Sequence, residues 1–492
     1  MVLAQIPDIS GLQNLEEFSI QNCATLIEID KSIGFQGNLK ILRIAKCTEI
    51  RIIPPLMLPS LEELYISDCS NLEYFSPVID EFGDKLKIMS VRHCIKLRSI
   101  PPLKLDSLET LELSGCDTLE SFPLVVDTFL TKLKTLNVNS CRNLRSIPPL
   151  KLDSLERLVL SYCHSLESFP LVVDQYLGKL KTMLVTNCLS LKSIPPLKLD
   201  SLELSGCDTR ESFPLMVDTF LAKLKTLNVK CCRNLRSIPP LMLESLETLV
   251  LSDCHSLESF PIVVDEHLGK LKTMLVTNCL SLRSIPPLKL DSLETLDLSC
   301  CYSLENFPLV VDGFLGKLKT MVVKNCHNLR SIPPLKLDLL EKLDLSNCFM
   351  LESLSSVGDG LLDKLKFVNI EFCIMLRSMP QLSLTSLENF NLSYCYSLKS
   401  FRNILGEMRN IRGLLLVETP IKESSYPFRN RSQLQTFHRC NCEYDNRSDG
   451  NDPKLTIMNE EKVNASNVKY ICAGTLNLQM NYCQKLLCCL PM

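Results

Sequence analysis

The chain has 492 residues, with 53 basic and 56 acidic side chains, so its formal net charge is −3. This near-balance argues against a protein that binds nucleic acid or an anionic membrane, because counterion-driven attraction requires an excess of basic residues. Apolar residues make up 46% of the chain, and no apolar run approaches the ~18 residues of a membrane span. The composition therefore predicts a folded protein with a sizeable core and excludes a disordered chain.

The chain contains 25 cysteines and no tryptophan. So many cysteines are typical of secreted disulfide proteins, but those proteins are small and poor in core residues. Residues 1–10 also lack the basic start and the long apolar stretch of a signal peptide. We therefore expect reduced thiols and a cytoplasmic or nuclear protein without a membrane span.

The cysteines recur at regular intervals, which indicates a repeat architecture. After a first interval of 24 residues, intervals of 22 and 25 residues alternate, with one exception of 19 residues between Cys188 and Cys207. Around each cysteine runs the pattern L-x-x-L-x-L-x-x-C-x-x-L-x-x-[IF]-P, as at residues 133–148. This is the leucine-rich repeat with cysteine in its Asn/Cys position. The column comprises Cys23, Cys47, Cys69, Cys94, Cys116, Cys141, Cys163, Cys188, Cys207, Cys232, Cys254, Cys279, Cys301, Cys326, Cys348, Cys373 and Cys395.

The repeat pattern predicts the fold. Apolar residues at every second position indicate a strand, so each repeat contributes one strand to a shared parallel sheet and turns its variable residues to solvent. The cysteine is expected beneath the following turn as a small apolar residue. Proline keeps helices out of the return segments, apart from single turns such as residues 170–177. We predict an α/β solenoid, a leucine-rich-repeat horseshoe with a concave parallel β-sheet and a convex face of extended, 3-10 and short helical segments.

We expect the repeat array to span residues 1–442. Regular repeats cover about residues 12–402, and degenerate repeats cover about residues 403–442. Residues 443–492 are expected to form an irregular tail with at most one partial repeat. The array begins halfway through a repeat, without the polar capping unit that solenoids normally carry.

One repeat is irregular. Residues 201–207 lack three residues relative to residues 107–116, and Arg210 stands where a leucine packs in other repeats. We expect a shortened strand there and a charge directed at the core, which would make this the weakest point of the sheet. Residues 99–192 and 193–283 also resemble each other as blocks of four repeats, which indicates duplication of a large segment.

The first variable position of each strand alternates in charge. Stacked in a parallel sheet, these residues would form a self-neutralising ladder of ion pairs, and we prefer this interpretation to a charged binding stripe. The ladder comprises Glu16, Lys40, Glu62, Lys87, Glu109, Lys134, Glu156, Lys181, Lys225, Glu247, Lys272, Glu294, Lys319, Glu341, Lys366 and Glu388.

The sequence offers little chemistry. It has no phosphate-binding loop, no G-x-S-x-G or H-E-x-x-H motif and no kinase signature. His438, Cys440 and Cys442 form a metal-like cluster, but a C-x-C spacing is not that of a structural zinc site. We therefore predict that the protein is not an enzyme and has no catalytic residues, cofactor or metal.

A protein partner is the remaining expectation. Apolar residues at the middle outward position of a strand could form a contact stripe, although β-branched residues also simply suit strands. Towards the end of the array, aromatic residues accompany polar ones at positions expected to face outward, as in binding interfaces. The candidate partner-binding residues are Val159, Leu184, Val250, Leu275, Phe367, Asn369, Glu371, Phe372, Asn391 and Tyr394.

Three segments resemble a known family. Residues 5–19 (Q-I-P-D-I-S-G-L-Q-N-L-E-E-F-S), the L-K-T-L-N-V-x-x-C-R-N-L-R-S-I-P-P units and residues 410–423 are similar to the leucine-rich repeats of plant TIR–nucleotide-binding–LRR disease-resistance proteins, most of all the legume members. The TIR and nucleotide-binding domains of that class are absent from this sequence, so signalling and nucleotide binding are not implied.

The resemblance implies protein–protein recognition in plant defence, as part of an immune receptor or derived from one. Implied partners are a pathogen effector, a host protein guarded by the receptor, or a nucleotide-binding receptor domain. Three alternatives stay open: an adaptor of a ubiquitin ligase, a secreted receptor ectodomain, and a truncated product without signalling function.

Overall fold

The structure is a computed structural model, and it describes the chain in segments. These are residues 4–75, 85–100, 105–122, 130–148, 152–167, 179–191, 199–206, 223–238, 243–260, 268–307, 315–354, 362–379, 382–383, 385–398, 404–405, 410–420 and 435–438. They fall into two compact units, Met1–Leu318 and Lys319–Met492.

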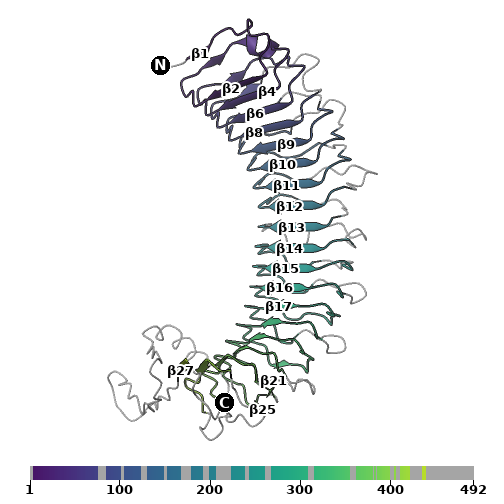
Figure 1. The fold of residues 1–492 in the computed structure, drawn as a ribbon, viewed down its shortest axis with the longest axis vertical. Coiled ribbons are helices and arrows are strands. Elements are labelled where there is room, and N and C mark those ends of the chain that lie inside the picture. Colours follow the sequence, from purple (N-terminus) through teal and green to yellow (C-terminus); the bar gives the residue numbers. More distant parts are fainter. Residues whose placement is uncertain are drawn as a thin grey trace, which may run out of the picture. The chain divides into compact units, whose positions relative to one another are not determined.

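The first unit is built on one parallel sheet whose strands pair in chain order (Figure 1). Each repeat supplies one strand, in register with the next. The strands are β2 (Glu17–Gln21), β4 (Ile41–Ala45), β6 (Glu63–Ser67), β8 (Ile88–Arg92), β9 (Thr110–Ser114), β10 (Thr135–Asn139), β11 (Arg157–Ser161), β12 (Thr182–Thr186), β13 (Ser201–Ser205), β14 (Thr226–Lys230), β15 (Thr248–Ser252), β16 (Thr273–Thr277) and β17 (Thr295–Asp297).

The second unit continues the same pattern with shorter strands, again parallel and in chain order. The shortening has a local cause in several repeats, where an Asp or Asn side chain in the strand accepts the backbone N–H two residues on and bends the chain early. The strands are β18 (Thr320–Val322), β20 (Lys342–Asp344), β22 (Phe367–Asn369), β24 (Asn389–Asn391), β26 (Gly413–Leu415) and β27 (Thr436–His438).

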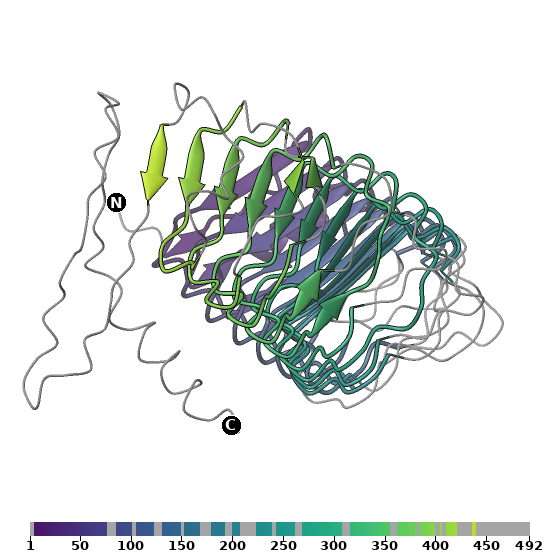
Figure 2. The same ribbon diagram turned by 90° about the horizontal axis from the view of Figure 1, so that it is seen from below.

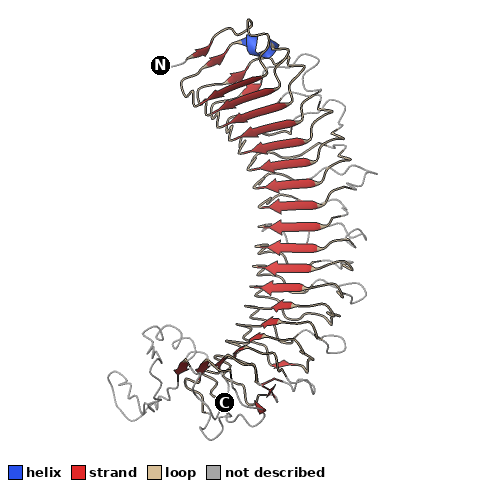
Figure 3. Ribbon diagram, in the orientation of Figure 1, coloured by secondary structure: helices blue, strands red, loops and turns tan. Residues whose placement is uncertain are grey.

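The return side of the repeats is almost free of helix. Figure 2 shows the long strands on one side of the repeats and the return segments on the other. Among the described residues the one helix is the 3-10 helix η1 (Lys31–Phe35), drawn in blue in Figure 3. Short parallel pairs join some return segments: β1 (Gln5–Ile6) with β3 (Glu28–Ile29), β5 (Ile52–Ile53) with β7 (Tyr74–Phe75), β19 (Ser331–Ile332) with β21 (Ser353–Leu354), and β23 (Leu382–Ser383) with β25 (Ile404–Leu405).

The predicted leucine-rich-repeat solenoid is confirmed. The inward residues of each repeat form a continuous apolar core; in one repeat Leu133, Leu136, Val138 and Leu144 have no exposed surface. The single helical turn expected at residues 170–177 lies outside the described residues. So do Arg210, Cys440, Cys442 and the tail that follows them.

The cysteines of the column also form hydrogen bonds between repeats. Sixteen members are described, all with free thiols and all buried except the half-buried Cys23. Many of the thiols donate to a carbonyl oxygen of the preceding repeat; Sγ of Cys373 lies 3.1 Å from the oxygen of Leu345, and Sγ of Cys395 lies 3.1 Å from that of Ile370. Thr419 replaces cysteine in a later repeat, and its hydroxyl donates to Leu392 O at 2.6 Å. The thiol therefore acts as a buried donor between repeats.

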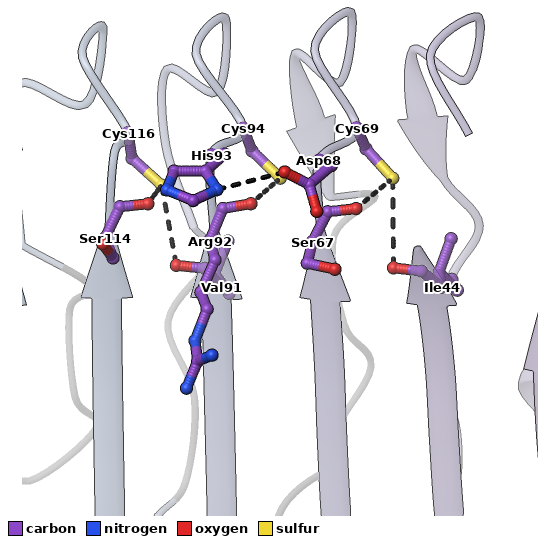
Figure 4. A network of polar contacts seen from close by, with 10 residues as sticks. All are labelled: Ile44, Ser67, Asp68, Cys69, Val91, Arg92, His93, Cys94, Ser114 and Cys116. Carbon is purple, nitrogen blue, oxygen red and sulfur yellow. Dashed lines mark hydrogen bonds and ion pairs between the residues drawn. The ribbon is translucent and has the colours of Figure 1, made fainter. Parts of the chain in front are cut away.

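The residue before each described cysteine of the column adopts the left-handed conformation. Examples are Asn187 (φ 51°) and Tyr162 (φ 53°), and glycine occurs there only at Gly115 and Gly206. Figure 4 shows this edge of the sheet, where the N–H of His93 donates to the carbonyl oxygen of Ser114 in the next repeat at 2.6 Å. The left-handed backbone disfavours L residues by roughly 1–2 kcal/mol. The inter-repeat hydrogen bond and the cysteine beneath the turn hold it in place.

The expectation of a shortened strand at residues 201–207 is wrong. β13 has five residues and pairs completely with β12 and β14, with Leu202 opposite Met183 and Leu227. Asp200 takes the ladder position, because its N–H donates to Lys181 O and its carbonyl accepts from Lys225 N. The three residues that this repeat lacks are therefore missing from the turn before the strand. Because apolar residues alternate in S-L-E-L-S, this segment can form the same five-residue strand although three residues are missing before it.

We expect the fold to lose stability at alkaline pH because of its thiols. Burial raises the pKa of Cys69 to about 11 and of Cys94 to about 12 from an ordinary value of 9.0. The protonated thiol is thus favoured by folding, so this stability is fully present below about pH 9 and is lost as pH rises towards about 12.

The measurement is the thermal unfolding midpoint at successive pH values across that window. The control variant carries Cys69→Thr and Cys94→Thr, which keep a donor at each position, as Thr419 does, but remove the titrating groups. Its midpoint should fall less steeply with pH than that of the natural chain. Equal slopes would contradict the assignment to thiols.

Candidate protein-binding surface

The outer face of the sheet in the first unit consists of the strand residues that point away from the core. Three such residues come from each full-length strand, and in β10 they are Thr135, Asn137 and Asn139, all partly exposed. We call the line of middle residues across the strands the central row. From β9 to β17 the central row reads Glu112, Asn137, Val159, Leu184, Glu203, Asn228, Val250, Leu275 and Asp297.

At the start of the sheet, the outer face is occupied by its own ion pairs. Arg43 pairs with Glu17 and with Glu63, and its guanidinium lies 5.0 Å from the ring centre of Tyr65. Arg92 lies 2.5 Å from Glu112, whose carboxylate also accepts from Ser90 Oγ at 3.0 Å and from Asn137 Nδ2 at 3.4 Å. The charges of these side chains are paired within the chain, although Oδ1 of Asn137 has no hydrogen-bond partner.

The ladder at the start of the strands is paired as well. Six of its lysines contact the acidic residue of the preceding repeat, as in Lys181–Glu156 at 2.8 Å and Lys272–Glu247 at 2.7 Å. The hydrogen bond and the charge of Lys181 lower the pKa of Glu156, and Glu156 raises the pKa of Lys181 in the same way. Most charges of the ladder are thus paired within the chain.

The four aliphatic candidates form two pairs on the central row. Val159 lies opposite Leu184 on β11 and β12, and Val250 lies opposite Leu275 on β15 and β16. All four are half-buried. Glu203 and Asn228 separate the two pairs, so the apolar stripe is interrupted by a polar gap.

The expectation that Phe372 and Tyr394 are exposed is wrong. Their exposed fractions are 7% and 8%, because both occupy the left-handed position before a cysteine and stack on each other with ring centres 4.3 Å apart. Phe367 is half-buried, and Nζ of Lys342 lies 5.4 Å from its ring centre. Tyr396 is more exposed than Tyr394 and packs edge-on against it.

The polar candidates beside these aromatics have structural partners. Oδ1 of Asn369 accepts from Glu371 N at 3.3 Å, and Oδ1 of Asn391 accepts from Ser393 N at 3.0 Å. Nδ2 of Asn391 also donates to Glu371 Oε2 at 3.2 Å. Burial raises the pKa of Glu371, with the charge of Asp344 adding to the shift and the amide of Asn391 opposing it.

Sequence reasoning missed Glu203. The three missing residues obscured its register, because matching Ser201-Leu202-Glu203 to Ser107-Leu108-Glu109 places Glu203 on the ladder. Matching on the glycine before the cysteine, Gly206 with Gly115, would have placed it beside Glu112 on the central row. Within the described segments, no group of three His, Cys, Asp or Glu residues is arranged to hold a metal ion.

Comparison with known proteins gives a family similarity for part of the array. Residues 148–280, which include β11 to β16, match the leucine-rich repeats of RPS2-like plant disease resistance proteins. The chain is also 36% identical over 73 residues to disease resistance protein RRS1B and 32% identical over 74 residues to protein SUPPRESSOR OF npr1-1, CONSTITUTIVE 1, both from Arabidopsis thaliana. Each match covers 15% of this chain and 5% of the relative.

Solved structures with similarity are leucine-rich-repeat proteins. One from Bacteroides ovatus is 15% identical, with a TM-score of 0.26, and the match covers 84% of this chain and 92% of that one. The plant peptide hormone receptor RGFR1 in complex with RGF2 is 13% identical, with a TM-score of 0.19, covering 83% and 81%. TM-scores this low add nothing to the fold, which the strand pairing itself establishes. In the described part of the chain, no helix has the length and apolar character needed to cross a membrane.

We expect Phe372 to stabilise the second unit. Phe372→Ala should lower the local free energy of unfolding by about 3 kcal/mol, because it removes a buried ring from its stack. Tyr396→Ala, at a position 39% exposed, should lower it by less than about 1 kcal/mol. Hydrogen exchange of the backbone amides in residues 385–398 measures both. Equal protection in the two variants would show that the stack carries no such stability.

Proposed function

We propose that this chain is a non-catalytic protein-recognition solenoid of plant defence, part of or derived from an immune receptor of the TIR–nucleotide-binding–LRR class. The observation that carries the proposal is the outer face of β10 to β16. There most outward side chains are partly exposed, and the two aliphatic pairs Val159–Leu184 and Val250–Leu275 turn away from the core. Aliphatic side chains on an otherwise polar face favour contact with another protein.

The position of this face supports a role in defence. Residues 148–280 carry both aliphatic pairs and are the same residues that are similar to the repeats of RPS2-like resistance proteins. The partners that fit the proposal are a pathogen effector, a host protein guarded by the receptor, or a nucleotide-binding receptor domain. The cytoplasm or nucleus of a plant cell is the compartment in which we expect the protein to act.

The second unit is a secondary contact region in this proposal. Phe367 remains a contact candidate because its ring is only half-buried. Phe372, Tyr394, Asn369, Asn391 and Glu371 would act mainly by shaping that surface, because they already contact one another or the backbone.

The test is affinity purification with the full chain from healthy and infected plant tissue, followed by mass spectrometry. A double variant, Val159→Ser with Leu184→Ser, should lose the captured partner, because it removes apolar contact area from the outer face. Lys181→Ala is the matched control, since it changes the neighbouring ladder and leaves the central row intact. Capture that is the same with all three proteins would contradict binding through this face.

A further inference from the structure

Glu203 stands at the centre of the outer face without a partner. It is half-buried on β13, between Leu184 on β12 and Asn228 on β14. Across the described segments, no side chain ion-pairs or hydrogen-bonds with Glu203. Lys230 on the next strand lies opposite Ser205, and no ion pair joins it to Glu203.

The neighbouring amide also has an unused acceptor. Oδ1 of Asn228 is buried and has no hydrogen-bond partner, and the same holds for Oδ1 of Asn137, the equivalent residue of the first block. A carboxylate and a buried amide oxygen side by side both require hydrogen-bond donors, and a buried acceptor without one destabilises the protein. The pair therefore favours a ligand group with several N–H donors.

The internal duplication shows which group fits. In the first block the equivalent residues are Glu112 and Asn137, and there Arg92 of β8 supplies a guanidinium 2.5 Å from the carboxylate. In the second block the place of Arg92 is taken by Thr186, which lies opposite Ser205 as Arg92 lies opposite Ser114. The chain thus contains one copy whose carboxylate is paired with an arginine and one copy whose carboxylate is not, whereas the amide oxygen lacks a partner in both copies.

The surroundings of the copy without an arginine are also specific. Val159 and Leu184 lie on one side of Glu203–Asn228, and Val250 and Leu275 lie on the other. From β11 to β16 the row spans five strand spacings, about 24 Å. An extended segment of about seven residues covers that length.

We propose that Glu203, beside Asn228, binds an arginine side chain of the protein partner, with apolar partner residues on either side resting on the two aliphatic pairs. The guanidinium carries five N–H donors in one plane, so two of them can donate to both oxygens of the Glu203 carboxylate. Lysine provides a point charge without that planar geometry and fits less well. This inference rests on the proposed function, since it specifies the partner chemistry for the same face.

The experiment is selection of random peptides of about seven residues, displayed on phage, on the full chain and on the Glu203→Gln variant. Sequences with a central arginine between apolar residues should be enriched on the natural chain and not on Glu203→Gln. The dissociation constant of a selected peptide should rise at least about tenfold in Glu203→Gln and on replacing its arginine by citrulline. Glu112→Gln is the matched control and should leave the constant unchanged, because Arg92 already occupies that copy.

A second variant creates the missing site. Arg92→Thr frees Glu112 and makes the first block resemble the second. The natural chain should bind one selected peptide, and this variant should bind two. The new site should be the weaker one, because it has an aliphatic pair on one side only. Selected peptides without arginine whose binding Glu203→Gln does not change would overturn the arginine site and leave the proposed function standing. Failure to select any peptide would also overturn the arginine site, while the tissue capture described above judges the proposed function separately.

Discussion

The fold depends on hydrogen bonds that pass from each repeat to the next at the end of the strand. There the backbone turns through a left-handed residue whose N–H donates to the following repeat, and a buried thiol donates to the preceding one. A parallel strand cannot bury its own polar backbone, so each repeat depends on both neighbours. Thr419 shows that the donor is what the position requires, because a hydroxyl replaces the thiol and makes the equivalent bond.

This constraint leaves the outer face of the sheet free to vary. The inward residues and the cysteine are fixed by packing, and the ladder at the strand starts is fixed by its ion pairs. Between β11 and β16 the central row is fixed neither by core packing nor by ion pairs, so its side chains can be selected for contact with another molecule. The duplicated segment shows this difference, because Arg92 pairs with the carboxylate of Glu112 in one copy and Glu203 has no such partner in the other.

In the second unit, side chains at the corresponding positions stabilise the fold instead. Asn369 and Asn391 bond to the backbone two residues on, and Phe372 stacks on Tyr394 at the turn. Residues that look like binding residues in sequence are here part of the architecture. Polar and aromatic character at an outward position is therefore a weak indicator of contact unless the local backbone is known.

The sequence by itself determined the solenoid, its parallel sheet and the column of cysteines, because a fixed period with alternating apolar residues has one good packing solution. It could not determine where the three missing residues would be absorbed, since S-L-E-L-S fits the strand in more than one register. Tertiary structure decided that β13 stays whole and that Glu203 joins the central row. It also decided that Phe372 and Tyr394 are buried, because the left-handed turn before the cysteine redirects side chains that a regular strand would place outward.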